Sequence, residues 1–217
     1  MTSTYEGRRI DQPHLVLVEG EDDVSFFQEL IAFLQLPGFQ VWDTKGKYGF
    51  RADLSAVAKD PHFHILDSLG IARDNDDDPA GTERSIRGAL ADAGLSLPSG
   101  PLASSPGTPT IVYTTLPRPG ITGEIEDLCL EAVADSPELT CVHAYFACLS
   151  QQGVPSPHDL SKAKVQTFLA SKADLTSRPG QAARKGYWSW SSPAFDQLAR
   201  FARLLADPSA QGNPGDK

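Results

Sequence analysis

The sequence predicts an α/β protein in which a mostly parallel β-sheet is flanked by helices and followed by a helical C-terminal extension. Over the first 135 residues, short apolar runs alternate with segments of helical periodicity. That alternation is typical of a parallel sheet covered on both faces. After about residue 137 only helical patterns remain, so the second part of the chain is expected to add helices and no further strands.

Four short runs are the expected strands. Each has the length and the apolar or β-branched character of a buried strand. They are residues 14–18 (HLVLV), 39–42 (FQVW), 68–73 (SLGIAR) and 110–114 (TIVYT).

Seven segments have helical periodicity. In the first of them, Phe27, Leu30 and Leu34 share one face, and Pro79 stands early in its helix, where proline is tolerated. The expected helices are residues 22–35, 51–59, 79–93, 122–134, 138–152, 160–172 and 193–206. We therefore expect an α/β domain over residues 1–135, a helical extension over 136–206 packing on it, and a disordered tail over 207–217.

Composition and charge narrow the class of protein. The 217 residues are 40% hydrophobic and 22% charged, as in ordinary globular proteins. No apolar run reaches the roughly eighteen residues of a membrane helix, and the N-terminus lacks the apolar core of a secretory signal. The three cysteines have no metal-binding spacing and are expected to be buried free thiols. A cytoplasmic protein with no membrane partner is the expectation.

The charge is unevenly distributed along the chain. Residues 1–150 carry 10 Lys+Arg and 23 Asp+Glu, a net of −13, whereas residues 151–205 carry 8 Lys+Arg and 3 Asp, a net of +5. This split fits a metal site beside a phosphate-binding surface, and it equally fits two halves that attract each other.

An acidic cluster, DNDDD, follows the third expected strand. Asp74 and Asp76 are close enough to raise each other's pKa, and a divalent cation would reverse that repulsion. Oxygen ligands without His or Cys suit Mg²⁺ or Mn²⁺. A calcium loop of the EF-hand type is disfavoured because Pro79 replaces its required Gly and Ser85 its final Glu. A solvated acidic turn with Asp78 capping the next helix is the simpler alternative.

A second acidic group follows the first expected strand, in LVLVEGEDD (residues 15–23). Gly20 allows the chain to turn sharply after Glu19. Because ligands of parallel sheets lie beyond the carboxyl ends of the strands, Glu19 and Asp74 are expected at the same edge of the sheet.

These two motifs together resemble the Toprim domain of topoisomerases, DnaG-type primases, OLD-family nucleases and a ribosomal-RNA maturase. The first motif is matched by Glu19, Gly20 and Asp22, and the second by Asp74 and Asp76. The resemblance covers residues 13–135. GEIEDLCL, SKAKVQTFLA and KGYWSW, further along, look similar to a family of small Toprim-like proteins related to OLD-type nucleases.

The resemblance implies a metal site and its residues. Glu19 would act as general acid/base or metal ligand, the Asp pair would bind Mg²⁺ or Mn²⁺, and the acids of the expected 122–134 helix would serve a second cation. The implied metal ligands are Glu19, Asp22, Asp74, Asp76, Glu126 and Asp127. The implied catalytic residues are Glu19, Asp74, Asp76, Lys162 and Lys164. From the residues alone, the acids of that helix are equally well explained as first-turn acids favoured by the helix dipole.

Other basic and aromatic residues have two interpretations each. Lys162 and Lys164 would contact the scissile phosphate or belong to a solvated amphipathic helix. Lys45 and Lys47 flank a Gly in a loop that could meet a phosphate backbone. Trp188 and Trp190 could stack on bases, or anchor a helix to the core.

The leading functional hypothesis is a Mg²⁺- or Mn²⁺-dependent nuclease acting on DNA or RNA. The alternative is a non-catalytic or partner-activated Toprim module in defence or repair, which binds nucleic acid or a separate ATPase. The ATPase would be a separate protein, because this sequence contains no G-x-x-x-x-G-K-[ST] nucleotide-binding loop. A second copy of the same chain, in a homodimer, is a further expected partner. A phosphorylatable receiver domain is disfavoured because its late Lys-Pro is missing.

Overall fold

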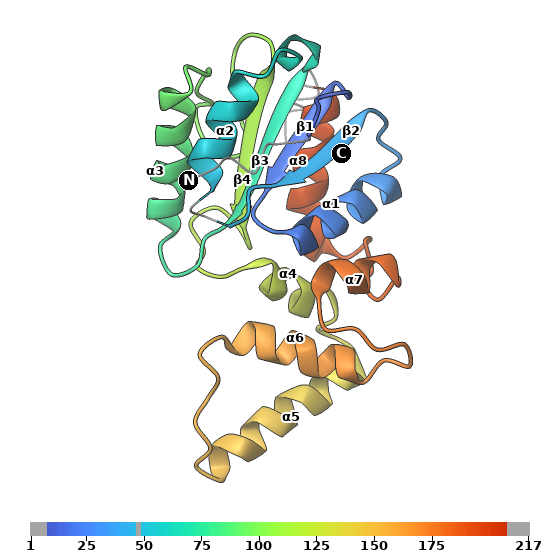
Figure 1. Cartoon of the computed structure of the whole chain (residues 1–217). Helices are drawn as coiled ribbons and strands as arrows, with labels where there is room; N and C mark the ends of the chain where they lie inside the picture. Colours follow the sequence, from blue (N-terminus) through green and yellow to red (C-terminus); the bar gives the residue numbers. More distant parts are fainter. Residues whose placement is uncertain (1–7, 47–48, 208–217) are drawn as a thin grey trace, which may run out of the picture.

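The computed structural model describes residues 8–46 and 49–207, and its centre is a four-stranded parallel sheet of order β2-β1-β3-β4 (Figure 1). The strands are β1 (His14–Val18), β2 (Phe39–Asp43), β3 (Ser68–Asp74) and β4 (Thr110–Leu116). All three strand pairings are parallel, with His14 opposite both Phe39 and Ser68. The predicted α/β class and all four predicted strands are confirmed.

Helices cover both faces of this sheet and its C-terminal edge. They are α1 (Glu21–Phe33), α2 (Phe50–Ala58), α3 (Pro79–Asp92), α4 (Ile125–Ala132), α5 (Pro137–Gln151), α6 (Leu160–Ala170), α7 (Pro179–Arg184) and α8 (Asp196–Ala206), with short 3₁₀ turns η1 (Phe63–Ile65) and η2 (Pro193–Phe195). Side chains of α2 and α3 pack with Leu15 and Leu17 of β1, and side chains of α1 and α8 pack with Val16 and Val18. Because β1 is buried on both faces, it is apolar from Leu15 to Val18 instead of alternating.

Helix α8 returns from the C-terminal segment to complete the core. It packs on β3 and β4. At Gly70 in β3, an added Cβ would lie 2.5 Å from Leu205 Cδ1 and 2.8 Å from Phe201 Cζ, so the helix approaches the sheet more closely than any larger residue would permit. The division of the chain at residue 135 stays a prediction. The predicted tail lies, except for Asp207, outside the described residues.

Helices α4, α6 and α7 lie beyond one end of the sheet, and α5 and α6 form an outlying pair (Figure 1). Trp188 anchors this region to the core: it is 3% exposed, stacks on Phe168 with ring centroids 5.9 Å apart, and donates its indole N–H to the Pro179 carbonyl at 2.8 Å. Trp190 packs edge-on against Phe26. Both tryptophans therefore pack against the core, as the second of the two interpretations of these residues expected.

Two sequence expectations differ from the structure. Helix α7 was not among the helices expected from the sequence. Proline is accepted in its first turn, and the glycine at position 180 is required by the packing described below. Burial of all cysteines was also wrong. Cys129 is buried, whereas Cys141 and Cys148 are exposed on α5.

Candidate active site

A cavity of about 530 Å³ opens at the C-terminal edge of the sheet. The turn after β1, the ends of β2 and β3, the starts of α1 and α4, and helix α6 all contribute to its walls. Its acidic lining residues are Glu19, Glu21, Asp22, Asp23, Asp43, Asp74, Glu124 and Glu126, and its basic ones are Lys45, Lys162 and Arg178. The expectation that Glu19 and Asp74 share one sheet edge agrees with this arrangement.

Glu19 is held in place by a buried arginine of the adjacent strand. Its Oε1 accepts a hydrogen bond from Arg73 Nε at 2.9 Å, and Arg73 is only 5% exposed. The guanidinium lies 4.8 Å from the ring centroid of Phe50 and bonds Ser85 Oγ at 3.2 Å. A buried charge needs such a partner, so this ion pair fixes the orientation of Glu19.

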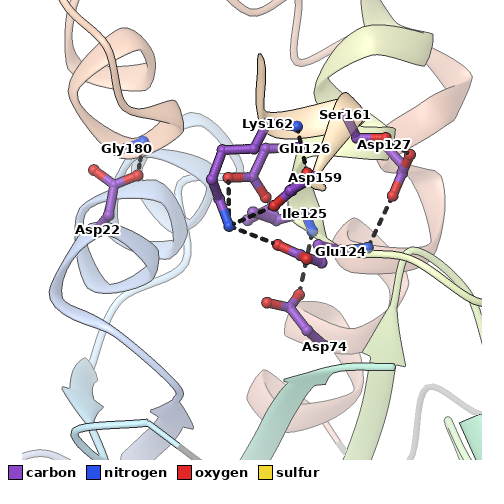
Figure 2. A network of polar contacts seen from close by, with 10 residues as sticks. All are labelled: Asp22, Asp74, Glu124, Ile125, Glu126, Asp127, Asp159, Ser161, Lys162 and Gly180. Carbon is purple, nitrogen blue, oxygen red and sulfur yellow. Dashed lines mark hydrogen bonds and ion pairs between the residues drawn. The ribbon is translucent and has the colours of Figure 1, made fainter. Parts of the chain in front are cut away.

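Asp74 ends β3 and points to the start of α4. Its Oδ1 accepts a hydrogen bond from the Ile125 N–H at 3.2 Å (Figure 2). Burial, together with the negative charges of Asp23 and Glu19, raises the pKa of Asp74 well above its ordinary value. Its ionised form is therefore destabilised in the protein without a bound cation.

Lys162 of α6 carries its ammonium group into the carboxylates of α4 (Figure 2). Its Nζ lies 2.9 Å from Glu124 Oε2, 3.0 Å from Asp159 Oδ2 and 3.8 Å from Glu126 Oε1. Burial alone would lower the pKa of Lys162, but the bonds to Glu124 and Asp159 outweigh it and raise the pKa. Glu126 is 5% exposed, and burial raises its pKa to about 7 despite the nearby ammonium.

Two predicted metal ligands bind groups of the protein itself. Asp22 Oδ2 accepts a hydrogen bond from the Gly180 N–H of α7 at 2.8 Å. Asp127 accepts one from the Glu124 N–H at 2.9 Å and one from the Ser161 hydroxyl at 2.6 Å, which joins α4 to α6. Both carboxylates thus connect segments far apart in the sequence. Figure 2 shows them on opposite sides of the cluster of carboxylates around Lys162.

The structure separates the two aspartates of the D-x-D motif. Asp76 has a positive φ of 46° and pairs its backbone with Gly123, so its side chain lines a neighbouring hollow with Asp127 and Asp159. Glu124 lines both hollows. Asp78 is the N-cap of α3, accepting the Gly81 N–H at 2.8 Å, as the simpler interpretation of the acidic cluster expected.

The candidate lysines also lie in different places. Lys164 lines a separate pocket between α5 and α6 with His143 and Phe146, whereas Lys162 lines the carboxylate cavity. Lys45 forms ion pairs with Glu21 at 2.7 Å and Asp43 at 2.8 Å. Lys47 lies outside the described residues.

Sequence reasoning did not single out several residues of the cavity. Asp23 caps α1 by accepting the Gly20 N–H at 2.9 Å, and burial with the charges of Asp22 and Glu19 raises the pKa of Asp23 to about 7. Asp43 ends β2 and could have been found by the strand-end rule that led to Glu19. Arg73 carried no signal, because an arginine inside a strand is ordinarily read as a surface residue.

The donor set fits a hard divalent cation in its chemistry, because carboxylate oxygens surround the cavity and some of them have raised pKa values. In its geometry the set is incomplete. Within residues 8–46 and 49–207, no three Asp, Glu, His or Cys side chains are arranged to hold a metal ion.

Comparison with solved structures identifies the fold class. The C-terminal region of the OLD protein of Xanthomonas campestris pv. campestris matches with a TM-score of 0.52 and 14% identity, over 91% of this chain and 98% of that one. A second structure of the same region matches at 13% identity with a TM-score of 0.39, over 93% of this chain and 87% of that one. At these identities the likeness concerns the fold alone.

The particular family follows from the sequence. Residues 13–207 match DUF3226, described as "Protein of unknown function", and the chain belongs to this family. No curated protein matches the sequence significantly. In the part of the chain that the structure describes, every helix is too short or too polar to cross a membrane.

Proposed function

We propose that the protein hydrolyses phosphodiester bonds of nucleic acid with the help of Mg²⁺ or Mn²⁺, as an OLD-type nuclease. One observation carries this proposal. Glu19, Asp74 and Glu126 come from three separate elements and line one cavity at the C-terminal edge of the sheet. Carboxylates that gather in one cavity repel one another, burial and this repulsion raise the pKa values of Asp74 and Glu126, and perturbed pKa values cluster at functional sites.

The ligands proposed for the cation are Glu19, Asp74 and Glu126, with Glu124 beside them. When bound, the cation supplies charge neutralisation of the phosphate and lowers the pKa of water. Small side-chain movements are required, because these groups are not yet arranged as a metal site. Asp76 and Asp127 line the neighbouring hollow and are proposed only as ligands of a second cation.

The chain's own residues then have distinct roles. Glu19 accepts a proton from the attacking water, since Arg73 keeps its carboxylate fixed at the cavity wall. Lys162 stabilises negative charge that develops on the phosphate, because its ammonium already lies among the carboxylates that would surround that group.

A second candidate function is a partner-activated or non-catalytic Toprim module. Lys162 and Arg73 already supply positive charge to Glu124 and Glu19, and that charge lowers the demand for a cation. In this alternative the protein binds nucleic acid or a separate ATPase, and the partner's binding draws the carboxylates together.

A cleavage assay tests the proposal. The full chain is incubated with supercoiled plasmid, single-stranded DNA and structured RNA in Mg²⁺, Mn²⁺ or EDTA. Glu19→Gln and Asp74→Asn are expected to abolish metal-dependent cleavage. Asp67→Asn is the control, because Asp67 is an exposed aspartate just before β3 and lines neither the cavity nor the neighbouring hollow.

The outcomes separate the two functions. Cleavage that is lost in EDTA and in both cavity variants, and kept in Asp67→Asn, supports the nuclease. Cleavage that survives both cavity variants refutes this active site. A folded protein that binds Mn²⁺ or nucleic acid but cleaves nothing favours the partner-activated module.

A further inference from the structure

A row of polar side chains follows one face of α7, starting at the carboxylate cavity. Arg178 is the N-cap of α7, and Gln181 and Arg184 follow it at intervals of three residues, so each lies next to the following one, and all three are exposed. They line a hollow of about 480 Å³ between α7 and α1. Arg178 lines both this hollow and the carboxylate cavity, so the two are adjacent.

The position of this row is determined by close packing of α7 on α1. An added Cβ at Gly180 would lie 2.1 Å from the backbone oxygen of Asp22, which shows how closely the two helices approach. Asp22 caps the start of α7 through Gly180 N–H, and Trp188 holds the Pro179 carbonyl from the other side. The guanidinium groups are therefore carried by a rigid element.

The positive charge of the row is only partly neutralised by neighbouring carboxylates. Within the described residues, no carboxylate forms an ion pair with Arg178 or Arg184. Of the acids that line the same hollow, Asp43 pairs with Arg8 and Lys45, and Glu21 pairs with Lys45 at 2.7 Å. Asp22 accepts the Gly180 N–H, and its carboxylate lies close enough to both guanidinium groups to offset part of their charge. Two guanidinium groups thus remain for an anionic ligand.

Their spacing fits a polymer of phosphates. Arg184 lies six positions after Arg178, the N-cap of α7, which corresponds to a rise of about 9 Å along the helix. One strand of nucleic acid presents a phosphate about every 3.4 Å along its axis in a duplex, so the two arginines can contact phosphates two or three nucleotides apart. Guanidinium groups bind phosphate oxygens in a bidentate manner.

We propose that the groove between α1 and α7 binds the phosphate backbone of the nucleic-acid strand that enters the carboxylate cavity, with Arg178 and Arg184 as its phosphate contacts. This inference rests on the proposed function, because it locates the substrate of that same site. Binding of this kind is independent of base sequence and depends strongly on salt.

Fluorescence anisotropy with labelled single-stranded DNA and RNA, measured in EDTA over a range of salt concentrations, tests the groove. The full chain is compared with Arg178→Ala/Arg184→Ala and with the charge-keeping Arg178→Lys/Arg184→Lys. The matched control is Arg200→Ala/Arg203→Ala, which removes two exposed arginines from α8, a helix that lines neither hollow.

Loss of two phosphate contacts is expected to weaken binding at 0.1 M salt by on the order of tenfold or more, and to reduce the slope of log K against log salt by about 1.4. The lysine variant should keep most of the affinity and most of the salt slope, and the α8 variant should match the parent in both. Circular dichroism establishes that each variant is folded.

The results distinguish the proposed phosphate-binding groove from the proposed nuclease function. Weaker binding with the reduced slope in the α7 alanine variant alone supports the groove. Unchanged binding by that variant, when the parent binds and cleaves nucleic acid, overturns the groove and leaves the proposed function standing. A parent that neither binds nor cleaves any of these nucleic acids overturns both.

Discussion

Replacement of Glu126 by Gln should remove a defined part of the pH dependence of stability. Burial raises the pKa of Glu126 from 4.5 to about 7. The neutral form is therefore favoured in the native state, so this group destabilises the fold as pH rises from about 4 and reaches its full effect above about 7. At about 1.4 kcal/mol per pKa unit, the destabilisation at pH 8 is roughly 3 kcal/mol in the absence of metal.

Gln has nearly the same shape as neutral Glu and cannot ionise. We expect Glu126→Gln to resemble the parent at pH 4 and to exceed its free energy of unfolding by up to about 3 kcal/mol at pH 8 in EDTA. Urea unfolding at intervals between these pH values measures the difference. The matched control is Glu131→Gln, which changes an exposed glutamate on the same helix, α4.

Metal addition should nearly cancel this difference in stability. If Glu126 is a ligand, Mg²⁺ or Mn²⁺ at about 100 times its dissociation constant should stabilise the parent by about 2.7 kcal/mol at pH 8, and the variant much less. Equal pH slopes for parent and Glu126→Gln in EDTA would refute the reasoning, because they would mean that Glu126 ionises without a penalty.

Further substitutions test the roles assigned to Asp22, Gly180 and the two lysines of α6. Asp22→Asn should keep the cap of α7 and leave the cation affinity, measured by calorimetry, within about twofold of that of the parent. Asp22→Ala should lose about 1 kcal/mol of stability. A large loss of cation affinity in Asp22→Asn would instead make Asp22 a metal ligand. Gly180→Ala should lower the free energy of unfolding by about 1–3 kcal/mol, because its Cβ meets the backbone of α1, and an unchanged melting temperature would contradict that packing. Lys162→Ala should lower cleavage by about 100-fold or more while Lys164→Ala leaves it nearly unchanged, and equal losses in the two variants would show that their different positions do not matter.

The strands and the sheet edge were predictable because their signals are local. HLVLV is apolar after its first residue, which is typical of a strand buried on both faces, and Glu-Gly follows it directly. The carboxyl ends of parallel strands meet at one edge, so Glu19 and Asp74 could be placed together before any contact was known. Helix α7 was not predictable in this way, since Pro179 and Gly180 favour a loop and only packing on α1 explains them.

The sequence by itself determined the α/β class, the four strands, most of the helices, and the placement of Glu19 and Asp74 at the C-terminal edge of the sheet. Only the tertiary structure decided what each acid touches. Asp22 meets the Gly180 N–H across 158 residues of chain, and Glu19 meets Arg73 across 54. It also distinguished Lys162 from Lys164, because two residues along a helix turn a side chain to a different face. Contacts between distant segments depend on how whole elements pack, and no short pattern in the sequence carries that information.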